Sequence, residues 1–247
     1  MHVLLIKKER TTTVNNRQKV VSKGNEWLIP NNKDFHTSDG IITTKQLQTP
    51  GKHELGKETY YVLPAQPIDE YRARKQEVQK INLKDLGFIS AYIGLHKDMH
   101  IGEAGTGSAG ATTYFAQQIT KVTTYDIREV PARAELQNYK NVEVHQKDII
   151  KDDITQDGPF DAFLLDVPEP WNAWHNMQAV KIGGWIIGYT PSTNQLQKLV
   201  NTMPENFIHI HACEVIERHW RVKGLVCRPE TADHSHTAFL SFFRRIT

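Results

Sequence analysis

The sequence predicts an α/β fold: a doubly wound parallel sheet within residues 69–247, preceded by a small antiparallel β-domain over residues 1–68. From His100 onward, apolar strand-like segments alternate with helical ones. This pattern is typical of a parallel sheet covered by helices on both faces. Before residue 68, short apolar pieces are separated by turn signals such as "NN", "DG" and "PG", as in antiparallel β-structure. Between the two regions, "LPAQPIDE" has two prolines close together and predicts the domain boundary.

The N-terminal region contains short strand-like segments: "HVLLI", "KVV", "EWLI", "GIITT" and "YYVL". The stretch from Tyr71 to Leu95 mixes basic and apolar residues at helical spacing, which predicts one or two helices with a break near Asn82. Five strands are expected after it, at 100–104, 122–126, 142–146, 160–167 and 183–190. Helices are expected between them at 112–119, 130–139 and 172–180. The extended runs 207–220 and 236–243 predict an antiparallel edge.

Composition narrows the classes of function. Thirty basic and 28 acidic residues leave a net charge of +2, too small a surplus to argue for a nucleic-acid partner by itself. The two cysteines cannot form a disulfide framework, so a cytoplasmic location is expected. No apolar run approaches the roughly 20 residues that span a bilayer, so no membrane partner is expected.

The stretch "EAGTGSAG", residues 103–110, lies between a predicted strand and a predicted helix. Its glycines permit a tight turn and close approach of a ligand to the backbone, and the following helix start offers unpaired N–H groups. Dinucleotide-binding proteins use similar loops, but Glu103 would repel a pyrophosphate and attract an ammonium group. The loop residues expected to contact the ligand are Gly105, Thr106, Gly107, Ser108 and Ala109.

Acidic residues close four successive predicted strands: Glu103, Asp126, Asp148 and Asp166. Ligands of open α/β sheets bind at these carboxyl ends, where an acidic side chain can accept hydrogen bonds from a ribose. We assign that role to Asp126, with Ile127 beside it, and contact with an adenine amino group to Asp148. Any one of these acids can instead be an N-cap. The four together predict an adenosine with a cationic amino-acid tail, S-adenosylmethionine.

The stretch "LLDVPEPW", residues 164–171, ends a buried strand with an aspartate, two prolines and a tryptophan. Together with "EAGTGS" it resembles the tRNA (adenine-N1)-methyltransferase family that acts on the T-loop, whose members carry Asp-x-Pro-Asp/Glu-Pro-Trp after the fourth strand. Further likeness lies in "FHTSDGII" (35–42), "QKINLKD" (79–85), "RHWRVKGLVCRPE" (218–230) and "HTAFL" (236–240). The resemblance therefore extends over most of the chain.

This resemblance implies a Rossmann-like class I S-adenosylmethionine-dependent methyltransferase domain, and methylation of N1 of adenosine 58 in the tRNA T-loop, with 57 as a further target in archaeal-type members. It also implies a homotetramer and no metal. Gln79 is implied to reach the cofactor. Asp166 is expected to be catalytic, accepting a hydrogen bond from the N6 amino group of the base while positioning supplies most of the rate. The expected substrate-binding residues are Pro168, Trp171, Tyr189 and His236.

Three positions depart from the family pattern. Asn82 stands where relatives often have an aromatic residue, Ala109 replaces a third glycine, and Asp126 replaces a glutamate. Two alternatives remain: a non-catalytic tRNA-binding subunit, and a methyltransferase for a protein or a small molecule. The glycine loop and Asp166 argue against the first, and the proline–tryptophan hook against the second. The histidine pairs at 209–211 and 234–236 are expected to be packed or solvated rather than metal-binding.

Overall fold

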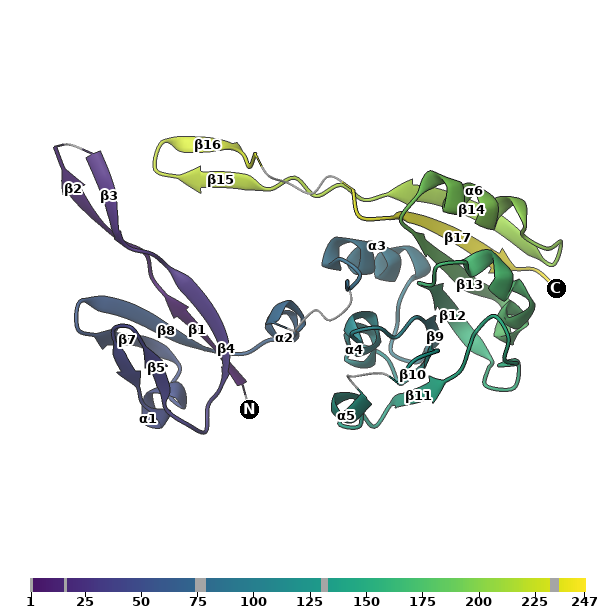
Figure 1. The fold of residues 1–247 in the computed structure, drawn as a ribbon, viewed down its shortest axis with the longest axis horizontal. Helices are drawn as coiled ribbons and strands as arrows, with labels where there is room; N and C mark the ends of the chain where they lie inside the picture. The colour runs from purple at the N-terminus through teal and green to yellow at the C-terminus, as the bar shows by residue number, and fades with distance from the viewer. Residues whose placement is uncertain (1, 16, 74–78, 130–132, 232–235) are drawn as a thin grey trace. The chain divides into compact units, whose positions relative to one another are not determined.

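The computed structural model describes residues 2–15, 17–73, 79–129, 133–231 and 236–247 (Figure 1). The chain divides into two compact units, Met1–Lys75 and Gln76–Thr247. The boundary expected after residue 68 falls within helix α2 (Pro67–Ala73), which belongs to the first unit. No helix in the described part of the chain is both long and apolar enough to cross a membrane.

The first unit is an antiparallel β-domain, as predicted. Its four-stranded sheet has the order β4 (Asn25–Pro30), β1 (His2–Lys7), β8 (Glu58–Pro64), β7 (Gly51–Leu55). Two hairpins accompany it, β2 (Arg10–Val14) with β3 (Arg17–Ser22) and β5 (Phe35–Thr37) with β6 (Gly40–Ile42), together with the short helix α1 (Thr44–Leu47). Alternate residues of β1 and β8 face the core, which contains Leu5, Ile42, Leu47, Tyr60 and Val62.

The second unit contains a seven-stranded sheet in the order β11 (Val142–Gln146), β10 (Lys121–Asp126), β9 (His100–Ala104), β12 (Phe160–Leu165), β13 (Val180–Thr190), β17 (Phe239–Arg245), β14 (Phe207–Glu214). The strands from β11 to β13 pair in parallel, and β17 pairs antiparallel with both of its neighbours. The predicted parallel sheet with an antiparallel edge is therefore confirmed. The chain order reverses between β9 and β12, and such a switch point is where ligands of open α/β sheets bind.

The helices of this unit are α3 (Leu83–Ile93), α4 (Gly110–Ala116), α5 (Arg133–Leu136) and α6 (Thr193–Asn201). The break expected near Asn82 is a helix start, because the Asn82 side chain accepts a hydrogen bond from the Lys84 N–H at 3.0 Å. A hairpin of β15 (Trp220–Lys223) and β16 (Val226–Pro229) precedes the last strand. The helix expected over 130–139 is described only from residue 133.

The helix expected over 172–180 is not an α-helix but a 3₁₀ helix, η1 (Pro170–Ala179). Its buried residues include Pro170, Ala173, Asn176 and Ala179, which recur at every third position. A 3₁₀ helix has three residues per turn, so this repeat places all four on one face. The Asn176 side chain donates to the backbone oxygens of Ile149 and Asp152, which fixes that face against the preceding loop.

Phe163 packs at the centre of the sheet and is fully buried. Its ring centroid lies 5.2 Å from that of Phe160 and 6.1 Å from that of Tyr125. We expect Phe163→Ala to lower the free energy of unfolding by about 3–5 kcal/mol, through lost apolar burial and the cavity left behind. Denaturant unfolding monitored by circular dichroism measures this effect, with Phe163→Leu as the milder matched change. A loss below about 1 kcal/mol would contradict the packing role.

Candidate active site

A cavity of about 870 Å³ lies at the carboxyl ends of β9, β10, β12 and β13. This volume is within the usual range for small-molecule sites, about 300–1,000 Å³. The expected site residues that line it are Gln79, Glu103, Gly105, Thr106, Gly107, Ser108, Asp126, Ile127, Asp148, Asp166, Pro168 and Tyr189. Segments far apart in the sequence thus meet at one edge of the sheet.

The glycine loop needs its glycines for geometric reasons. Gly105 has φ +93°, and a Cβ there would lie 2.0 Å from the backbone oxygen of Asp166. Gly107 has φ +50° and its N–H donates to the Asp126 carboxylate at 3.0 Å. Ala109 lies behind the cavity wall as the buried N-cap of α4, with φ 59°. Its left-handed backbone carries a cost of roughly 1–2 kcal/mol that a glycine would avoid.

Glu103 is almost completely buried at the end of β9. Its Oε2 accepts hydrogen bonds from the hydroxyls of Thr112 at 2.5 Å and Thr124 at 3.1 Å. Burial raises the pKa of Glu103 to about 8, and the two threonine hydrogen bonds only partly oppose that shift. A cationic group in the cavity would therefore favour the ionised form of this carboxyl.

Asp126 ends β10 and is tied to the glycine loop through Gly107. It also accepts from the Arg128 backbone N–H at 3.0 Å and the Arg128 Nε at 3.2 Å. Burial favours a higher pKa, but the hydrogen bonds from Arg128 and Gly107 outweigh it and hold the pKa of Asp126 below its usual range. Asp126 is therefore an ionised acceptor at neutral pH.

Asp148 follows β11 and combines two roles. Its carboxylate lies 2.9 Å from Lys151 Nζ and accepts from the Ile150 N–H at 3.0 Å. These hydrogen bonds, from Lys151 first, lower the pKa of Asp148. These contacts belong to a turn, and no helix begins there, so Asp148 is not an N-cap; its side chain lines the cavity.

Asp166 follows β12, and its N–H donates to the Ala104 oxygen of β9 at 2.9 Å. Burial raises the pKa of its carboxyl to about 7. The stiff segment after it is held by α6, because Gln195 Nε2 donates to the Pro168 oxygen at 3.0 Å. Lys198 Nζ lies 4.2 Å from the centre of the Trp171 ring, so this tryptophan packs against α6 beside the cavity. Sequence reasoning missed Lys198, which no motif marks.

Tyr189 is oriented by a buried network that the sequence does not reveal. Its hydroxyl donates to Asp85 Oδ2 at 3.2 Å, and Asp85 is fully buried. The same carboxylate accepts from Thr237 at 2.6 Å and from Lys84 at 2.7 Å. Burial raises the pKa of the Tyr189 hydroxyl, so it stays protonated at neutral pH.

His236 lies at the edge of the site rather than on its wall. Its ring nitrogens lie 2.8 Å from a Glu214 carboxylate oxygen and 3.1 Å from the Pro191 backbone oxygen, and Pro191 lines the cavity. The Glu214 contact raises the pKa of His236. Within the described residues, no group of three or more histidine, cysteine or acidic side chains has the arrangement of a metal site.

Comparison with known proteins identifies the family. The family model described as tRNA methyltransferase complex GCD14 subunit matches residues 58–228. The tRNA (adenine(57)-N(1)/adenine(58)-N(1))-methyltransferase TrmI of Methanocaldococcus jannaschii is 30% identical, over 91% of this chain and 93% of the relative. A tRNA (adenine(58)-N(1))-methyltransferase TrmI of Thermus thermophilus is 28% identical, over 85% of this chain and 88% of the relative.

Solved structures support the same fold. A Thermotoga maritima S-adenosylmethionine-dependent O-methyltransferase superposes with a TM-score of 0.81 at 26% identity, over 100% of this chain and 93% of that one. The tRNA (m1A58) methyltransferase TrmI of Aquifex aeolicus has a TM-score of 0.78 at 21% identity, over 100% of this chain and 97% of that one. The chain belongs to the tRNA methyltransferase complex GCD14 subunit family and has the fold of S-adenosylmethionine-dependent methyltransferases.

Proposed function

We propose that this protein transfers the methyl group of S-adenosylmethionine to N1 of adenosine 58 in the T-loop of tRNA, with adenosine 57 as a further target. The observation that carries the proposal is the placement of Asp166 in the same cavity as the glycine loop, at the switch point of the sheet. Family membership and the activity named for the Methanocaldococcus relative support it.

The cavity residues fit the cofactor by their chemistry. Gly105 and Gly107 have positive φ, so the loop takes a tight path along the cavity, where its backbone can approach a ligand closely. We assign the ribose hydroxyls to the ionised Asp126, the adenine amino group to Asp148, and the amino-acid ammonium group to Glu103. Gln79 lines the same cavity and is assigned to the cofactor as well. When bound, S-adenosylmethionine supplies an electrophilic methyl group on a sulfonium.

The proposed role of Asp166 follows from its position and charge. Adenine N1 has a lone pair, so holding it in line with the methyl group supplies most of the rate. Attack leaves positive charge on the ring, and a carboxylate that accepts a hydrogen bond from N6 stabilises it. Asp166 can then take up the proton that N6 loses. N1 lies on the Watson–Crick edge, so the base must leave its stack to enter the cavity.

The residues around Asp166 have supporting roles in this proposal. The Pro168 oxygen accepts a hydrogen bond from the Gln195 side chain, and Trp171 packs against Lys198, so both residues are held by α6. In this proposal they keep the Asp166 backbone rigid. The Tyr189 hydroxyl donates its hydrogen bond to Asp85, so the aromatic ring is the part of Tyr189 that a base can contact. His236 is assigned to the RNA at the edge of the cavity.

The test is methyl transfer from labelled S-adenosylmethionine to an unmodified tRNA transcript, followed by mapping of the product nucleoside. The proposal expects 1-methyladenosine in the T-loop of the wild-type transcript. In a transcript with guanosine at position 58, no methylated product should form at that position. A second transcript with guanosine at position 57 decides whether that site is used. Labelled product outside the T-loop would contradict the substrate assignment.

The pH dependence of the reaction should report Asp166. Its pKa is raised to about 7, so below that pH the carboxyl is protonated and cannot stabilise the methylated base. We therefore expect kcat/KM for tRNA to rise about tenfold per pH unit below 7 and to level off above it. Steady-state rates on both sides of pH 7 measure this. Ionisation of Glu103 would change the affinity for S-adenosylmethionine, so measuring that affinity over the same pH range separates its effect from that of Asp166. A rate that falls across this range as pH rises would contradict the assignment of Asp166.

We further propose a homotetramer in the cytoplasm. The β15–β16 hairpin exposes four large apolar side chains, Trp220, Val222, Leu225 and Val226, and exposed apolar patches mark interaction sites. Burying them between copies of the chain would remove this surface. Sedimentation analysis should show a single species of four chains, and a monomer at micromolar concentration would contradict the assembly. The two cysteines are free, as expected in a reducing compartment.

A further inference from the structure

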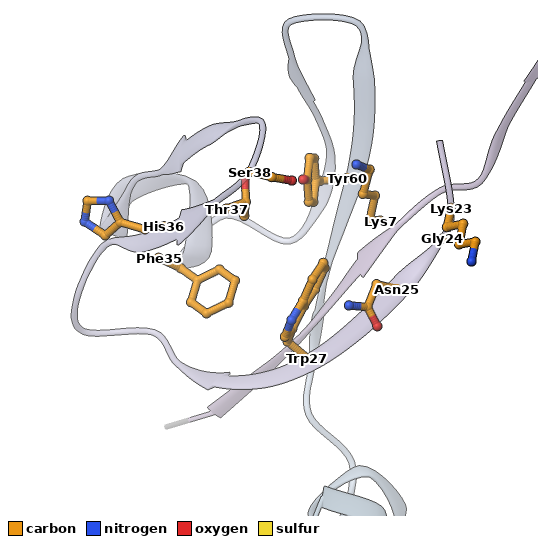
Figure 2. Close-up of a pocket in the computed structure, with 10 residues that line it drawn as sticks. All are labelled: Lys7, Lys23, Gly24, Asn25, Trp27, Phe35, His36, Thr37, Ser38 and Tyr60. Carbon is orange, nitrogen blue, oxygen red and sulfur yellow. The ribbon is translucent and has the colours of Figure 1, made fainter. Parts of the chain in front are cut away.

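The N-terminal unit contains a second pocket, separate from the cavity of the sheet unit. Its volume is about 630 Å³, again within the usual range for ligand sites, about 300–1,000 Å³. Side chains of β1, β4, β5, β8 and the β3–β4 turn form its walls (Figure 2). Nothing in the proposed methyl transfer uses these residues.

Two aromatic rings form one wall of this pocket. Trp27 and Phe35 are only partly buried, and their ring centroids lie 5.8 Å apart (Figure 2). Trp27 also lies near Tyr60, which lines the same pocket, with ring centroids 6.5 Å apart and an interplanar angle of 26°. Trp27 and Phe35 thus pack against the core of the unit and also line the pocket. Partly exposed aromatic faces of this kind are stacking platforms for nucleic-acid bases.

Polar and basic groups surround the aromatic wall. Lys23 and Asn25, from the β3–β4 turn and the start of β4, are exposed at the pocket. Lys7 lies deeper, where its Nζ is 2.6 Å from the Asp39 carboxylate. The Tyr60 hydroxyl donates to the same carboxylate at 2.5 Å. This network rigidifies the pocket floor, and Lys23 supplies the accessible positive charge.

The charge of the chain is unevenly distributed. Residues 1–75 contain 13 basic and 8 acidic residues, whereas residues 76–247 contain 17 basic and 20 acidic ones. The surplus of the N-terminal unit is therefore larger than the net charge of +2 for the whole chain. Such an asymmetry between parts of a chain indicates a polyanionic partner for the basic part.

We propose that this pocket binds an unpaired nucleotide of the RNA substrate, one other than the adenosine that is methylated. The base stacks on the Trp27 ring and meets the tilted Phe35 ring edge-on. The Asn25 amide meets the polar edge of the base, and Lys23 pairs with a flanking phosphate. The inference rests on the proposed function insofar as that function makes RNA the substrate. An amide with both a donor and an acceptor beside an aromatic wall fits a nucleobase better than a purely apolar ligand.

The experiment measures binding of an unmodified tRNA transcript to full-length protein, alongside its methylation. Trp27→Ala is expected to weaken RNA binding about tenfold, whereas Trp27→Phe keeps an aromatic face and stays close to wild type. Lys23→Gln should weaken binding more than Lys57→Gln, a matched charge loss in the exposed β7–β8 turn. Methyl transfer at saturating RNA and affinity for S-adenosylmethionine should not change, so KM rises while kcat is kept.

Ultraviolet crosslinking of the bound transcript provides a readout independent of activity. The proposal expects a crosslinked peptide that contains Trp27 or Phe35. It is overturned if Trp27→Ala binds RNA as wild type does, if Lys23→Gln and Lys57→Gln behave alike and no such peptide is found, or if the protein binds no RNA. Failure of the proposed function looks different: RNA then binds through this pocket but no T-loop 1-methyladenosine forms.

Discussion

Asp166→Ala is expected to lower kcat for T-loop methylation by a factor of about 10²–10³, the usual effect of removing one group that stabilises charge in a transition state. The side chain lies in the cavity at the end of β12. Alanine removes the acceptor for N6 and the charge that offsets the methylated ring. The backbone hydrogen bond from Asp166 to Ala104 does not involve the side chain, so the strand end should keep its place.

Two comparisons make this result specific. Asp166→Asn keeps the size of the side chain and an acceptor oxygen but loses the charge, so its rate should fall between those of wild type and alanine. Asp98→Asn, an exposed carboxylate in the loop before β9, should leave the rate unchanged. The affinity for S-adenosylmethionine, measured by calorimetry, should change much less than kcat. An alanine variant with wild-type kcat would remove Asp166 from the chemistry.

Asp166→Ala should also change how the free energy of unfolding depends on pH. A carboxyl whose pKa is raised by burial costs stability when it ionises, because the folded state disfavours the charge. The contribution of Asp166 to stability is present below its unfolded-state pKa and is lost as the pH rises through about 7. Neutral alanine avoids this loss, so the difference between Asp166→Ala and wild type should move in favour of the variant as pH rises from about 4 to about 8. A difference that moved the other way would contradict the burial of this group.

The parts of the fold and site that the sequence predicts are those with local signals. Alternating strand and helix segments predict the parallel sheet. Parallel strands place their carboxyl ends on one edge, so acids at those ends were expected to converge. The cavity indeed contains Glu103, Asp126, Asp148 and Asp166. The glycine loop is also predicted from local sequence. Gly105 and Gly107 have positive φ, a conformation that favours glycine, so the residue type itself marks the turn.

What the sequence does not predict depends on contacts between distant segments. The Tyr189–Asp85 and Asp85–Thr237 hydrogen bonds join residues 104 and 152 positions apart. Asp85 and Thr237 lie in stretches that resemble the family, but nothing in those stretches predicts that the two side chains pair with each other or with Tyr189. Lys198 over Trp171 arises only from the docking of α6 on η1. The 3₁₀ geometry of η1 likewise depends on which face the surrounding loops bury, and its short apolar spacing also fits an α-helix.

Gly105→Ala should strongly impair the glycine loop. The backbone there has φ +93°, which costs an alanine roughly 1–2 kcal/mol. The new Cβ would also lie 2.0 Å from the Asp166 oxygen, and a backbone atom cannot rotate away as a flexible side chain can. Relief requires moving either the loop or the segment that carries Asp166, at a further cost of about 1–3 kcal/mol.

Both movements disturb groups assigned to the cofactor. Because each 1.4 kcal/mol is a factor of ten, the affinity for S-adenosylmethionine should fall by about tenfold to a hundredfold. Methyl transfer should fall with it even at high cofactor concentration, because Asp166 moves too. Gly87→Ala is the matched control: this exposed helical glycine in α3 has nothing within 4 Å of a new Cβ. Alanine there should stabilise the protein by about 0.5–1 kcal/mol and leave cofactor affinity unchanged. If Gly105→Ala bound the cofactor as tightly as Gly87→Ala does, the close contact between the loop and the Asp166 segment would not be needed for the site.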